Sequence, residues 1–517
     1  MSDVLDRSIT VTEIAAMGQP IDVSPETTAA FVGRALRGPV NTPVLVHGYG
    51  DFRRRFGGEW ARSSLGPAVR GFFDHGGRKL YVVRVSNGAR GAMLCLPARG
   101  SALVLRAVEP GSTERIRAAV DFDRIDPGNH ELFNLTLQRI DPTTGLVTDQ
   151  EIFRGASYRE DAETFVGKLL ATSMLARVER PFPTHRPERT IGINARYEST
   201  YAGHAQDGTD GTELSDYDLI GSRPDGTGLF ALQQIGHFDI LYLPPPGKLR
   251  DVGPAAILAA ELYCRRRGAV LVVDPVAAWL KPDDVVKGVR DKGYRSPNMI
   301  SYFPRVLFRD DQDREARVAG GAIAGLLCKQ DRQHDADSDL EQQNGRFNRR
   351  ILPVIDVDDG AAGMLNRAGV NVIATGTAGR ARLIGSVTMG RGSESHRHFS
   401  NLRVRRFCLK VINAIDRSTR WAVFVHDDAH LADLLKSQIL GYLRCLSDRG
   451  VFASKKFVVM CDAGLCKRAN RLENGVTILL VFHPPGCAEP LTFTLHQTVA
   501  GCRVTSTAFA PVLEDCA

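Results

Sequence analysis

The stretch FVGRALRGPVNTPVLV, residues 31–46, decides the fold class of this chain. Its two ends, 31–33 and 44–46, are short apolar runs typical of strands, and the Gly38–Pro39 pair between them is typical of a turn. The chain continues through FRRRFGG (52–58) and FFDHGGRKLYVVRV (72–85), which ends in another apolar run. We therefore expect residues 25–90 to form an αβ unit.

Length and composition indicate a soluble protein of several domains. A chain of 517 residues exceeds what one hydrophobic core usually supports, so we expect about two to four domains. No window approaches the roughly 18 apolar residues of a membrane span, because the strongest run, 269–273, stops at Asp274–Pro275. The first six residues carry two acids and no apolar segment, so we expect no secretory signal and folding in a cytoplasm.

The charge of the chain is weakly basic and dispersed. It has 66 Lys and Arg against 59 Asp and Glu, a net charge of +7. Arginine is locally dense at 53–55, 265–267 and 403–406. A nucleic-acid-binding protein that uses these clusters is one alternative function, although such proteins concentrate their basic residues in one patch. The favoured prediction is that the chain binds no nucleic acid and that its mild basic excess suits an acidic protein partner.

Both ends of the chain predict extended arms. Residues 1–24 contain ITVTEI (9–14), where Ile9, Val11 and Ile14 belong to a β-prone stretch without a nearby hairpin partner. The backbone groups of such a strand need partners, and a neighbouring subunit supplies them. The last segment, 491–517, is predicted as a C-terminal strand or arm.

Between the arms the sequence alternates in character. Several short apolar runs with turn residues predict an inserted β-rich outer domain over 91–195. Apolar strands around a helix at 255–267 predict an αβ middle domain with surface loops over 196–350, and core-like sequence returns over 351–490. The fold class is α/β (mixed α+β): a core sheet flanked by helices and built from both N- and C-terminal parts, plus the inserted domain and the arms.

The order of these motifs resembles the sheath proteins of contractile phage tails. Residues 31–43 match that family's FVG-x-x-x-x-GP-x-N-x-P, and 72–85 match its FF-x-x-GG-x-x-x-Y-V-V-R-V. Residues 365–373 are similar to LN-x-x-GIN-x-I, and 401–424 to N-x-RR followed by RWAVF. Residues 321–325 resemble a glycine-bounded turn of the family.

The resemblance implies a structural protein and not an enzyme. Sheath subunits polymerise as stacked hexameric rings around a tail tube, and they contract to drive the tube through a target envelope. Terminal arms add strands to the sheets of neighbouring subunits, which would give Ile9, Val11 and Ile14 their partners. Expected partners are other copies of the chain, the tube protein, and baseplate and tail terminator proteins, with no membrane insertion. The expected location is a virion, or a tailocin or related injection device, after assembly in the host cytoplasm.

Two further hypotheses concern the C-terminal third. An amphipathic helix over 429–449 carries Lys436, Arg444 and Arg449 off its apolar stripe, and the family's attachment helix implies that these cations face the tube. Ordinary solvation of that helix face is the alternative. Half of the ten cysteines lie in the last 57 residues, and intersubunit disulfides are conceivable among four of them, namely Cys461, Cys466, Cys502 and Cys516.

No motif predicts a catalytic, cofactor or metal site. The second alternative function, a metal-dependent hydrolase, would use His426, His430 and Asp274, but the pattern His426-Asp427-Asp428-Ala429-His430 lacks the glutamate of the zincin motif. The acids at 207–216 do not have the spacing of a calcium loop. The glycine-rich stretches form no dinucleotide fingerprint and no nucleophile elbow.

Overall fold

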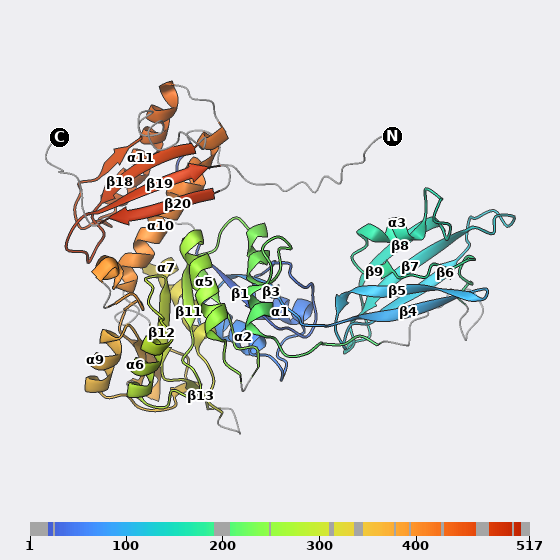
Figure 1. The fold of residues 1–517 in the computed structure, drawn as a ribbon, viewed down its shortest axis with the longest axis horizontal. Coiled ribbons are helices and arrows are strands. Elements are labelled where there is room, and N and C mark those ends of the chain that lie inside the picture. Colours follow the sequence, from blue (N-terminus) through green and yellow to red (C-terminus); the bar gives the residue numbers. More distant parts are fainter. Residues whose placement is uncertain are drawn as a thin grey trace.

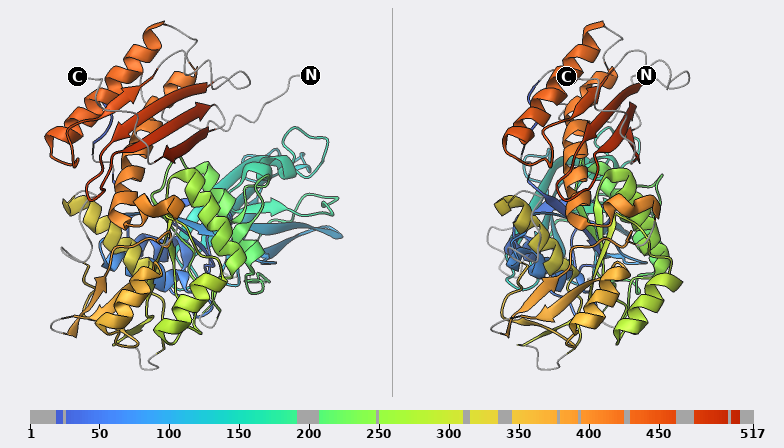
Figure 2. Two further views of the ribbon diagram at one scale, coloured as in Figure 1. Left: turned by 60° about the vertical axis from the view of Figure 1, so that its left-hand side comes forward. Right: turned by 90° about the vertical axis from the view of Figure 1, so that its left-hand side faces the viewer.

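The chain folds into three parts (Figure 1). The computed structural model describes residues 19–23, 26–190, 207–247, 250–309, 315–334, 345–376, 379–391, 394–424, 429–461, 475–498 and 501–507. A central core carries a domain inserted after its third strand, and a C-terminal layer lies on another side of the core (Figure 2). The predicted mixed α/β class, with a helix-flanked core sheet and an inserted β-rich domain, is confirmed.

An eight-stranded sheet forms the centre of the core, in the order β16-β15-β12-β11-β10-β1-β3-β2. The six inner strands run parallel, and the outermost strands β2 and β16 are antiparallel to their neighbours. Parallel strands with both faces covered need continuous apolar sequence, and all four residues of β11 are buried. The strands are β1 (Thr28–Gly33), β2 (Val44–Val46), β3 (Lys79–Arg84), β10 (Ile240–Tyr242), β11 (Val270–Val273), β12 (Met299–Phe303), β15 (Asn371–Thr375) and β16 (Ala381–Ile384).

Helices cover both faces of this sheet. On one face pack α1 (Tyr49–Phe56), α2 (Leu65–Asp74) and α7 (Gly320–His334). On the other pack α4 (Asp216–Ile220), η2 (Gly228–Gln234), α5 (Pro254–Arg267), α6 (Pro282–Asp291) and α9 (Asp359–Arg367). A small hairpin, β13 (Val306–Phe308) with β14 (Ile351–Pro353), lies beside them.

Segments far apart in the sequence share the central sheet. Strand β1 pairs directly with β3 on one side and with β10 on the other, so the expected N-terminal core and the expected middle domain meet within one sheet. Strands β15 and β16 extend the same sheet. The predicted turn at 321–325 is wrong, because these residues form the first turns of α7. There Gly321 and Gly325 allow close packing, since a Cβ would come within 2.2 Å of Ala68 O or 2.3 Å of Phe72 O.

The inserted domain lies between β3 and α4 and has a core of its own. It contains two three-stranded sheets, of order β4-β5-β9 and β6-β7-β8. Its described helical content is limited to two short turns. The elements are β4 (Gly91–Ala98), β5 (Ser101–Pro110), β6 (Ile116–Asp121), β7 (Leu132–Ile140), β8 (Val147–Ser157), α3 (Val166–Leu169), η1 (Leu170–Thr172) and β9 (Ala176–Val178).

The C-terminal layer packs two long helices on a four-stranded antiparallel sheet of order β17-β18-β19-β20. Helix α10 joins this layer to the core, because Leu402 and Leu409 pack in the core while Val404 and Phe407 pack in the layer. The elements are η4 (Glu394–Phe399), α10 (Leu402–Thr419), η5 (Arg420–Phe424), α11 (Ala429–Asp448), β17 (Val458–Met460), β18 (Gly475–Phe482), β19 (Leu491–Thr498) and β20 (Gly501–Thr507).

Candidate assembly surfaces

The sheet of the C-terminal layer has two open edges among the described residues. Its outer strands, β17 and β20, each pair on one side only. Strand β20 is exposed from Arg503 to Ser506, and Val504 keeps 43% of its surface accessible. An edge strand presents unpaired backbone N–H and C=O groups, and these groups can pair with a strand of another chain.

The C-terminal segment 491–507 forms strands, as expected, but they pair within the chain. Thr492 to Thr498 of β19 face Thr507 to Gly501 of β20 in an unbroken register. Residue Cys502, opposite Gln497, lies on the side of the sheet that packs on the helices. Of the predicted C-terminal arm, only residues 508–517 remain, and they lie outside the described residues.

The root of the N-terminal arm lies against the C-terminal layer. Ile21 is 4% exposed and packs in the core of the layer, together with half-buried Val23. The side-chain amide of Gln438 in α11 donates a hydrogen bond of 2.7 Å to the carbonyl oxygen of Gln19. The predicted strand residues Ile9, Val11 and Ile14 lie outside the described residues, a few positions upstream of this anchor.

Helix α11 carries the predicted tube-facing cations. Lys436 and Arg444 are exposed, and neither forms an ion pair with a described residue. They are eight residues apart and so lie on one side of the helix. Arg449, which directly follows α11, is also exposed. Exposed Asp433 and Asp448 flank the two helical cations, so the charge of this face is mixed.

The described cysteines are all free thiols. Cys461 is buried in the layer, and the thiol of Cys502 contacts the carboxylate of Asp416. Burial, together with this carboxylate, raises the pKa of the Cys502 thiol well above its usual value. Because the thiolate is the reactive form, Cys502 is held in an unreactive state in this fold. Cys466 and Cys516 lie outside the described residues, so the disulfide hypothesis stays a prediction.

The two described residues of the hydrolase alternative, His430 and Asp274, do not come together. His430 is exposed in the first turn of α11, whereas Asp274 follows β11 in the core, and His426 lies outside the described residues. Within the described ranges, no group of three or more His, Cys, Asp and Glu side chains is placed to hold a metal ion. Nor does any helix there have the length and apolar character to cross a membrane.

Asp274 has a structural partner set instead. Its carboxyl group accepts a hydrogen bond of 2.5 Å from the Tyr242 hydroxyl and one of 3.1 Å from the backbone N–H of Gly320, at the start of α7. Burial raises the pKa of Asp274 to about 7, although the Tyr242 bond and nearby Arg305 favour the carboxylate. Asp274 therefore ties the end of β11 to the beginning of α7.

We expect the Asp274→Asn variant to flatten the pH dependence of stability. The folded pKa of Asp274 lies above its unfolded value of 3.8, so the folded state retains a proton that the unfolded state has released. The contribution of Asp274 to the free energy of unfolding is at its maximum below about pH 4 and is lost as the pH rises through about 7. Between pH 5 and 7 the wild type should lose about 2 kcal/mol relative to the variant, measured by denaturant unfolding. Parallel curves for the two proteins would contradict this assignment.

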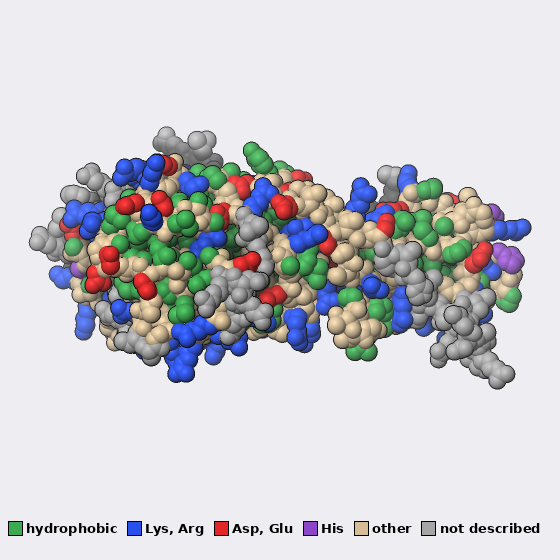
Figure 3. Space-filling model, turned by 90° about the horizontal axis from the view of Figure 1, so that it is seen from below, with side chains coloured by type: hydrophobic (Ala, Val, Ile, Leu, Met, Phe, Trp, Pro, Cys, Tyr) green, Lys and Arg blue, Asp and Glu red, His purple; other side chains and the backbone are tan. Residues whose placement is uncertain are grey.

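The arginine clusters are largely internal or paired. Arg405 donates a hydrogen bond of 2.7 Å to Asn298 Oδ1, and Arg406 forms a buried ion pair with Asp331. Arg55 pairs with Asp51 at 3.0 Å. Figure 3 shows blue and red side chains mixed over much of the face drawn, with one group of blue side chains along its lower edge. These features give the nucleic-acid-binding alternative no support.

The acids of the 207–216 loop have separate partners. Asp210 accepts hydrogen bonds from the backbone N–H (2.8 Å) and hydroxyl (2.9 Å) of Ser112. Asp216 accepts from the backbone N–H groups of Gly253 (2.9 Å) and Ala256 (3.1 Å) at the start of α5. The loop therefore fixes neighbouring elements and does not gather ligands for calcium.

Sequence reasoning missed a buried arginine that joins the inserted domain to the core. Arg84, the last residue of β3, is 1% exposed. Its guanidinium donates to the carbonyl oxygens of Ala35 (3.0 Å), Gly38 (2.6 Å) and Leu36 (3.3 Å) in the core and of Pro110 (2.7 Å) at the end of β5. Burial lowers its pKa to about 10, so the side chain stays charged at neutral pH. One residue thus holds the turn after β1 and the inserted domain together.

Two further contacts close the same junction. Arg34 donates to the carbonyl oxygens of Asp210 and Gly211, both at 3.1 Å, in the segment that returns from the inserted domain. Arg37 of the core pairs with Asp141 of the inserted domain at 3.2 Å, and each side chain is 18% exposed. The junction is therefore a network of ionic and backbone contacts.

Solved structures share this architecture over nearly the whole chain. The sheath tail protein of Listeria innocua has a TM-score of 0.61 and 14% identity, and the alignment covers 93% of this chain and 96% of that one. The chain has the tail sheath fold. The sheath tail protein of Desulfitobacterium hafniense gives a TM-score of 0.53 and 13% identity, with 93% and 98% covered. The contracted sheath complex of the extracellular contractile injection system PVC gives 0.51 and 11%, with 94% and 95% covered.

The sheath fold confirms the resemblance predicted from the sequence motifs. No protein-family model matches the sequence, and no curated protein matches it. The agreement therefore lies in the fold and in a few short motifs, of which FVG at 31–33 forms the second half of β1. The structural neighbours named above are sheath proteins of tails and injection systems.

Proposed function

We propose that this chain is the structural subunit of a contractile sheath. Copies of it polymerise as stacked hexameric rings around a tail tube and contract to drive the tube through a target cell envelope. The observation that carries the proposal is the sheath fold, which the alignment supports over 93% of this chain, together with the two open edges of the C-terminal sheet among the described residues. Further partners are the tube protein and the baseplate and terminator proteins. The site of action is a phage tail or injection device assembled in a host cytoplasm.

The proposal assigns the open edges to the arms of neighbouring copies. Fully extended, residues 1–18 reach about 60 Å from their anchor at Gln19 and Ile21. Main-chain pairing of a short strand gives a specific joint without a wide apolar surface. Such a joint holds two subunits while their other contacts change, which contraction requires.

Deletion of residues 1–18 is expected to abolish assembly and to leave the fold intact. The deletion removes Ile9, Val11 and Ile14 but no described residue. Negative-stain microscopy of the expressed wild type should show striated tubes, and the deletion should show none. Its melting temperature should stay within about 3 °C of the wild type, because every residue that the structure describes is retained.

A matched pair of point variants tests the arm more sharply. Val11→Pro removes a backbone donor from the predicted strand, whereas Val11→Thr keeps both the donor and a β-branched side chain. We expect tubes with Val11→Thr and a loss of most tubes with Val11→Pro. Ordered tubes from the truncated chain would remove the basis for intersubunit strand pairing.

We further propose that α11 faces the tube through Lys436 and Arg444. The double variant Lys436→Glu/Arg444→Glu should weaken co-assembly with the tube protein about tenfold in moderate salt, because it reverses two exposed charges. The variant Lys455→Glu/Lys456→Glu makes the same change in net charge on the exposed loop before β17 and should co-assemble normally. Sedimentation with preformed tubes measures the difference. Equal loss in both variants would leave α11 without a special role.

A further inference from the structure

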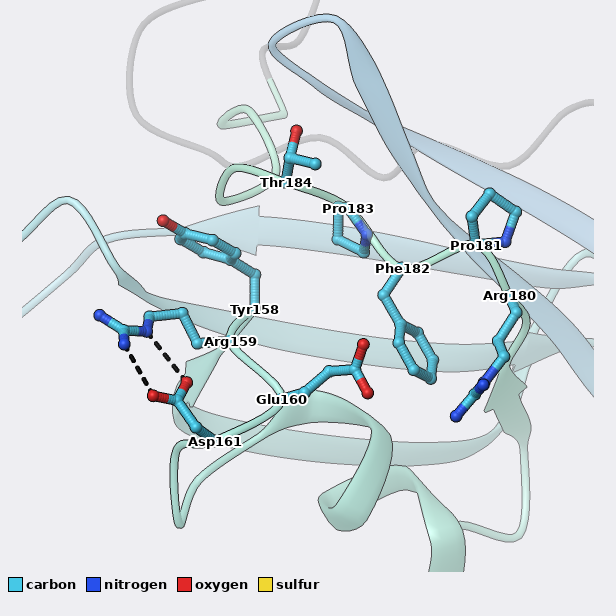
Figure 4. A pocket seen from close by; sticks show the side chains of 9 residues that line it. All are labelled: Tyr158, Arg159, Glu160, Asp161, Arg180, Pro181, Phe182, Pro183 and Thr184. Carbon is cyan, nitrogen blue, oxygen red and sulfur yellow. Dashed lines mark hydrogen bonds and ion pairs between the residues drawn. The ribbon is translucent and has the colours of Figure 1, made fainter.

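A hollow of about 900 Å³ opens on the inserted domain, where the chain leaves β8 and where it passes β9 (Figure 4). It is lined by residues 158–161 and 180–184. Its volume is in the range of sites that hold small organic ligands or short oligosaccharides. None of these residues takes part in the junction with the core described above.

Two aromatic side chains give the hollow firm walls. Tyr158 and Phe182 are half-buried and pack against the core of the inserted domain. The ring of Phe182 meets buried Phe165 edge-to-face, with centroids 5.0 Å apart. The guanidinium of Arg180 lies over the Phe182 ring, 5.1 Å from its centroid. Phe182 is therefore held in place before any ligand arrives.

The charged groups of the hollow are balanced, and two of them have no ionic partner. Arg159 and Asp161 form a two-pronged pair, with N–O distances of 3.0 and 2.7 Å. Among the described residues, the carboxylate of Glu160 and the guanidinium of Arg180 form no ion pair, and Glu160 extends into the hollow beside Phe182 (Figure 4). Two positive and two negative side chains leave the hollow without net charge.

We propose that this hollow binds a neutral carbohydrate. A sugar ring offers an apolar C–H face to an aromatic wall and hydroxyl groups at its rim that both donate and accept hydrogen bonds. Glu160 supplies acceptors and Arg180 supplies donors, so the lining matches both kinds of hydroxyl contact. A phosphorylated ligand would need net positive charge and a cationic one net negative charge. A purely apolar ligand would leave four charged groups in contact with it.

Binding of a carbohydrate in the hollow does not depend on the proposed function, but the biological role of that binding rests on it. In a sheath of the proposed kind the inserted domain faces outward, so the hollow would meet surface polysaccharides of the target. Many copies along one sheath would bind a polysaccharide with high avidity even if each site were weak, because each contact after the first is intramolecular.

Saturation-transfer NMR on the full-length chain tests the site. The probes are three neutral oligosaccharides (maltotriose, cellotriose and N,N′-diacetylchitobiose), one acidic sugar (sialyllactose) and one cationic sugar (fully deacetylated chitotriose). We expect at least one neutral probe to bind with a dissociation constant of about 1 mM. Glu160→Gln and Arg180→Gln should each weaken that binding about tenfold, because each removes a charge-assisted hydrogen bond.

Matched controls use exposed residues of the same domain that do not line the hollow. Glu188→Gln and Arg154→Gln make the same chemical changes and should bind the neutral probe like the wild type. The proposal is overturned if no neutral probe binds at a probe concentration of about 10 mM, which is ten times the expected dissociation constant. It is also overturned if Glu160→Gln and Arg180→Gln bind the neutral probe like the wild type, or if a charged probe binds more tightly than the neutral ones. The tube assembly of the same variants is scored separately, so failure of this site leaves the sheath proposal standing.

Discussion

Replacement of Arg84 by methionine is expected to lower the free energy of unfolding by about 4 kcal/mol. The side chain is 1% exposed and donates to four carbonyl oxygens. Methionine fills much of the same volume but leaves these four acceptors without a donor in a place that water does not reach freely. It also removes a positive charge near Glu109, whose pKa burial already raises. Chemical denaturation, followed by circular dichroism, measures the loss.

The same substitution should loosen the junction before it unfolds either domain. The inserted domain has its own core, and Arg84 is the residue whose hydrogen bonds join Pro110 at its end to the turn after β1. We therefore expect protease cleavage in the two connecting segments, 85–90 and 207–213, to become at least about tenfold faster, in line with a lower cost of local opening. A sheath subunit of the proposed kind needs a tight junction, because a loose outer domain would not follow the movement of the core.

Two control variants separate burial from charge. Arg84→Lys keeps the charge but cannot reach four acceptors, so it should lose about half as much stability as the methionine variant. Arg54→Met makes the same change at a side chain that is 78% exposed and that pairs, among the described residues, with Asp51 alone. It should change stability by less than about 0.5 kcal/mol. If Arg84→Met were as mild as Arg54→Met, Arg84 could not be the joint between the two parts.

Arg84 also shows what the sequence could reveal and what it could not. Its position within LYVVRV, residues 80–85, marks it as unusual, because a charged residue interrupts an apolar run in a strand of a buried sheet. That pattern predicts the strand but not the partners, since Ala35, Gly38 and Pro110 come from segments that only the fold brings together. The motif match was therefore enough to predict the fold but not the contacts at the junction between the inserted domain and the core.

The arginine-rich segment at 401–406 was harder to interpret from the sequence. Its resemblance to a family motif was correct, yet no helix was assigned to 402–419, which forms α10. Consecutive arginines suggested an exposed basic cluster, but on a helix neighbouring residues point to different sides. Arg405 accordingly bonds to Asn298, and Arg406 to Asp331. The direction of each side chain depends on the helix, so the buried Arg406–Asp331 ion pair could not be predicted without assigning that helix.

Domain limits raised a different difficulty. Strand β1 lies between β3 and β10, and the inserted domain separates these two in the sequence by more than a hundred residues. Apolar runs predict that each strand is buried, but they do not say which strands are neighbours. The inserted domain was recognisable because its alternating strands with frequent turns differ from the continuous apolar runs of a parallel sheet.

Breaking the Arg406–Asp331 pair from one side is expected to cost about 3–5 kcal/mol, whereas replacing both partners should cost much less. The two side chains are 8% and 10% exposed, and they join α10 to α7. Thr27, just before β1, donates a further hydrogen bond of 2.5 Å to the same Asp331 oxygen. Arg406→Met would leave the buried carboxylate of Asp331 without its ionic partner, and Asp331→Leu would leave the buried guanidinium of Arg406 without its ionic partner. The double variant Arg406→Met/Asp331→Leu should lie within about 1.5 kcal/mol of the wild type, because apolar side chains of similar volume can fill the space.

A full cycle of the four proteins measures this coupling by chemical denaturation, with microscopy of tubes as the second readout. The pair fixes the C-terminal layer, and with it both open strand edges, to the central sheet through α10. If that joint must be ionic for assembly, the double variant will be stable but will form no regular tubes; if apolar packing is enough, it will form them. Either result requires a coupling energy of at least about 2 kcal/mol between the two positions. Additive effects of the single changes would mean that Arg406 and Asp331 act separately. The layer would then be held to the core by other contacts of α10, such as the packing of Leu402 and Leu409 and the hydrogen bond from Arg405 to Asn298.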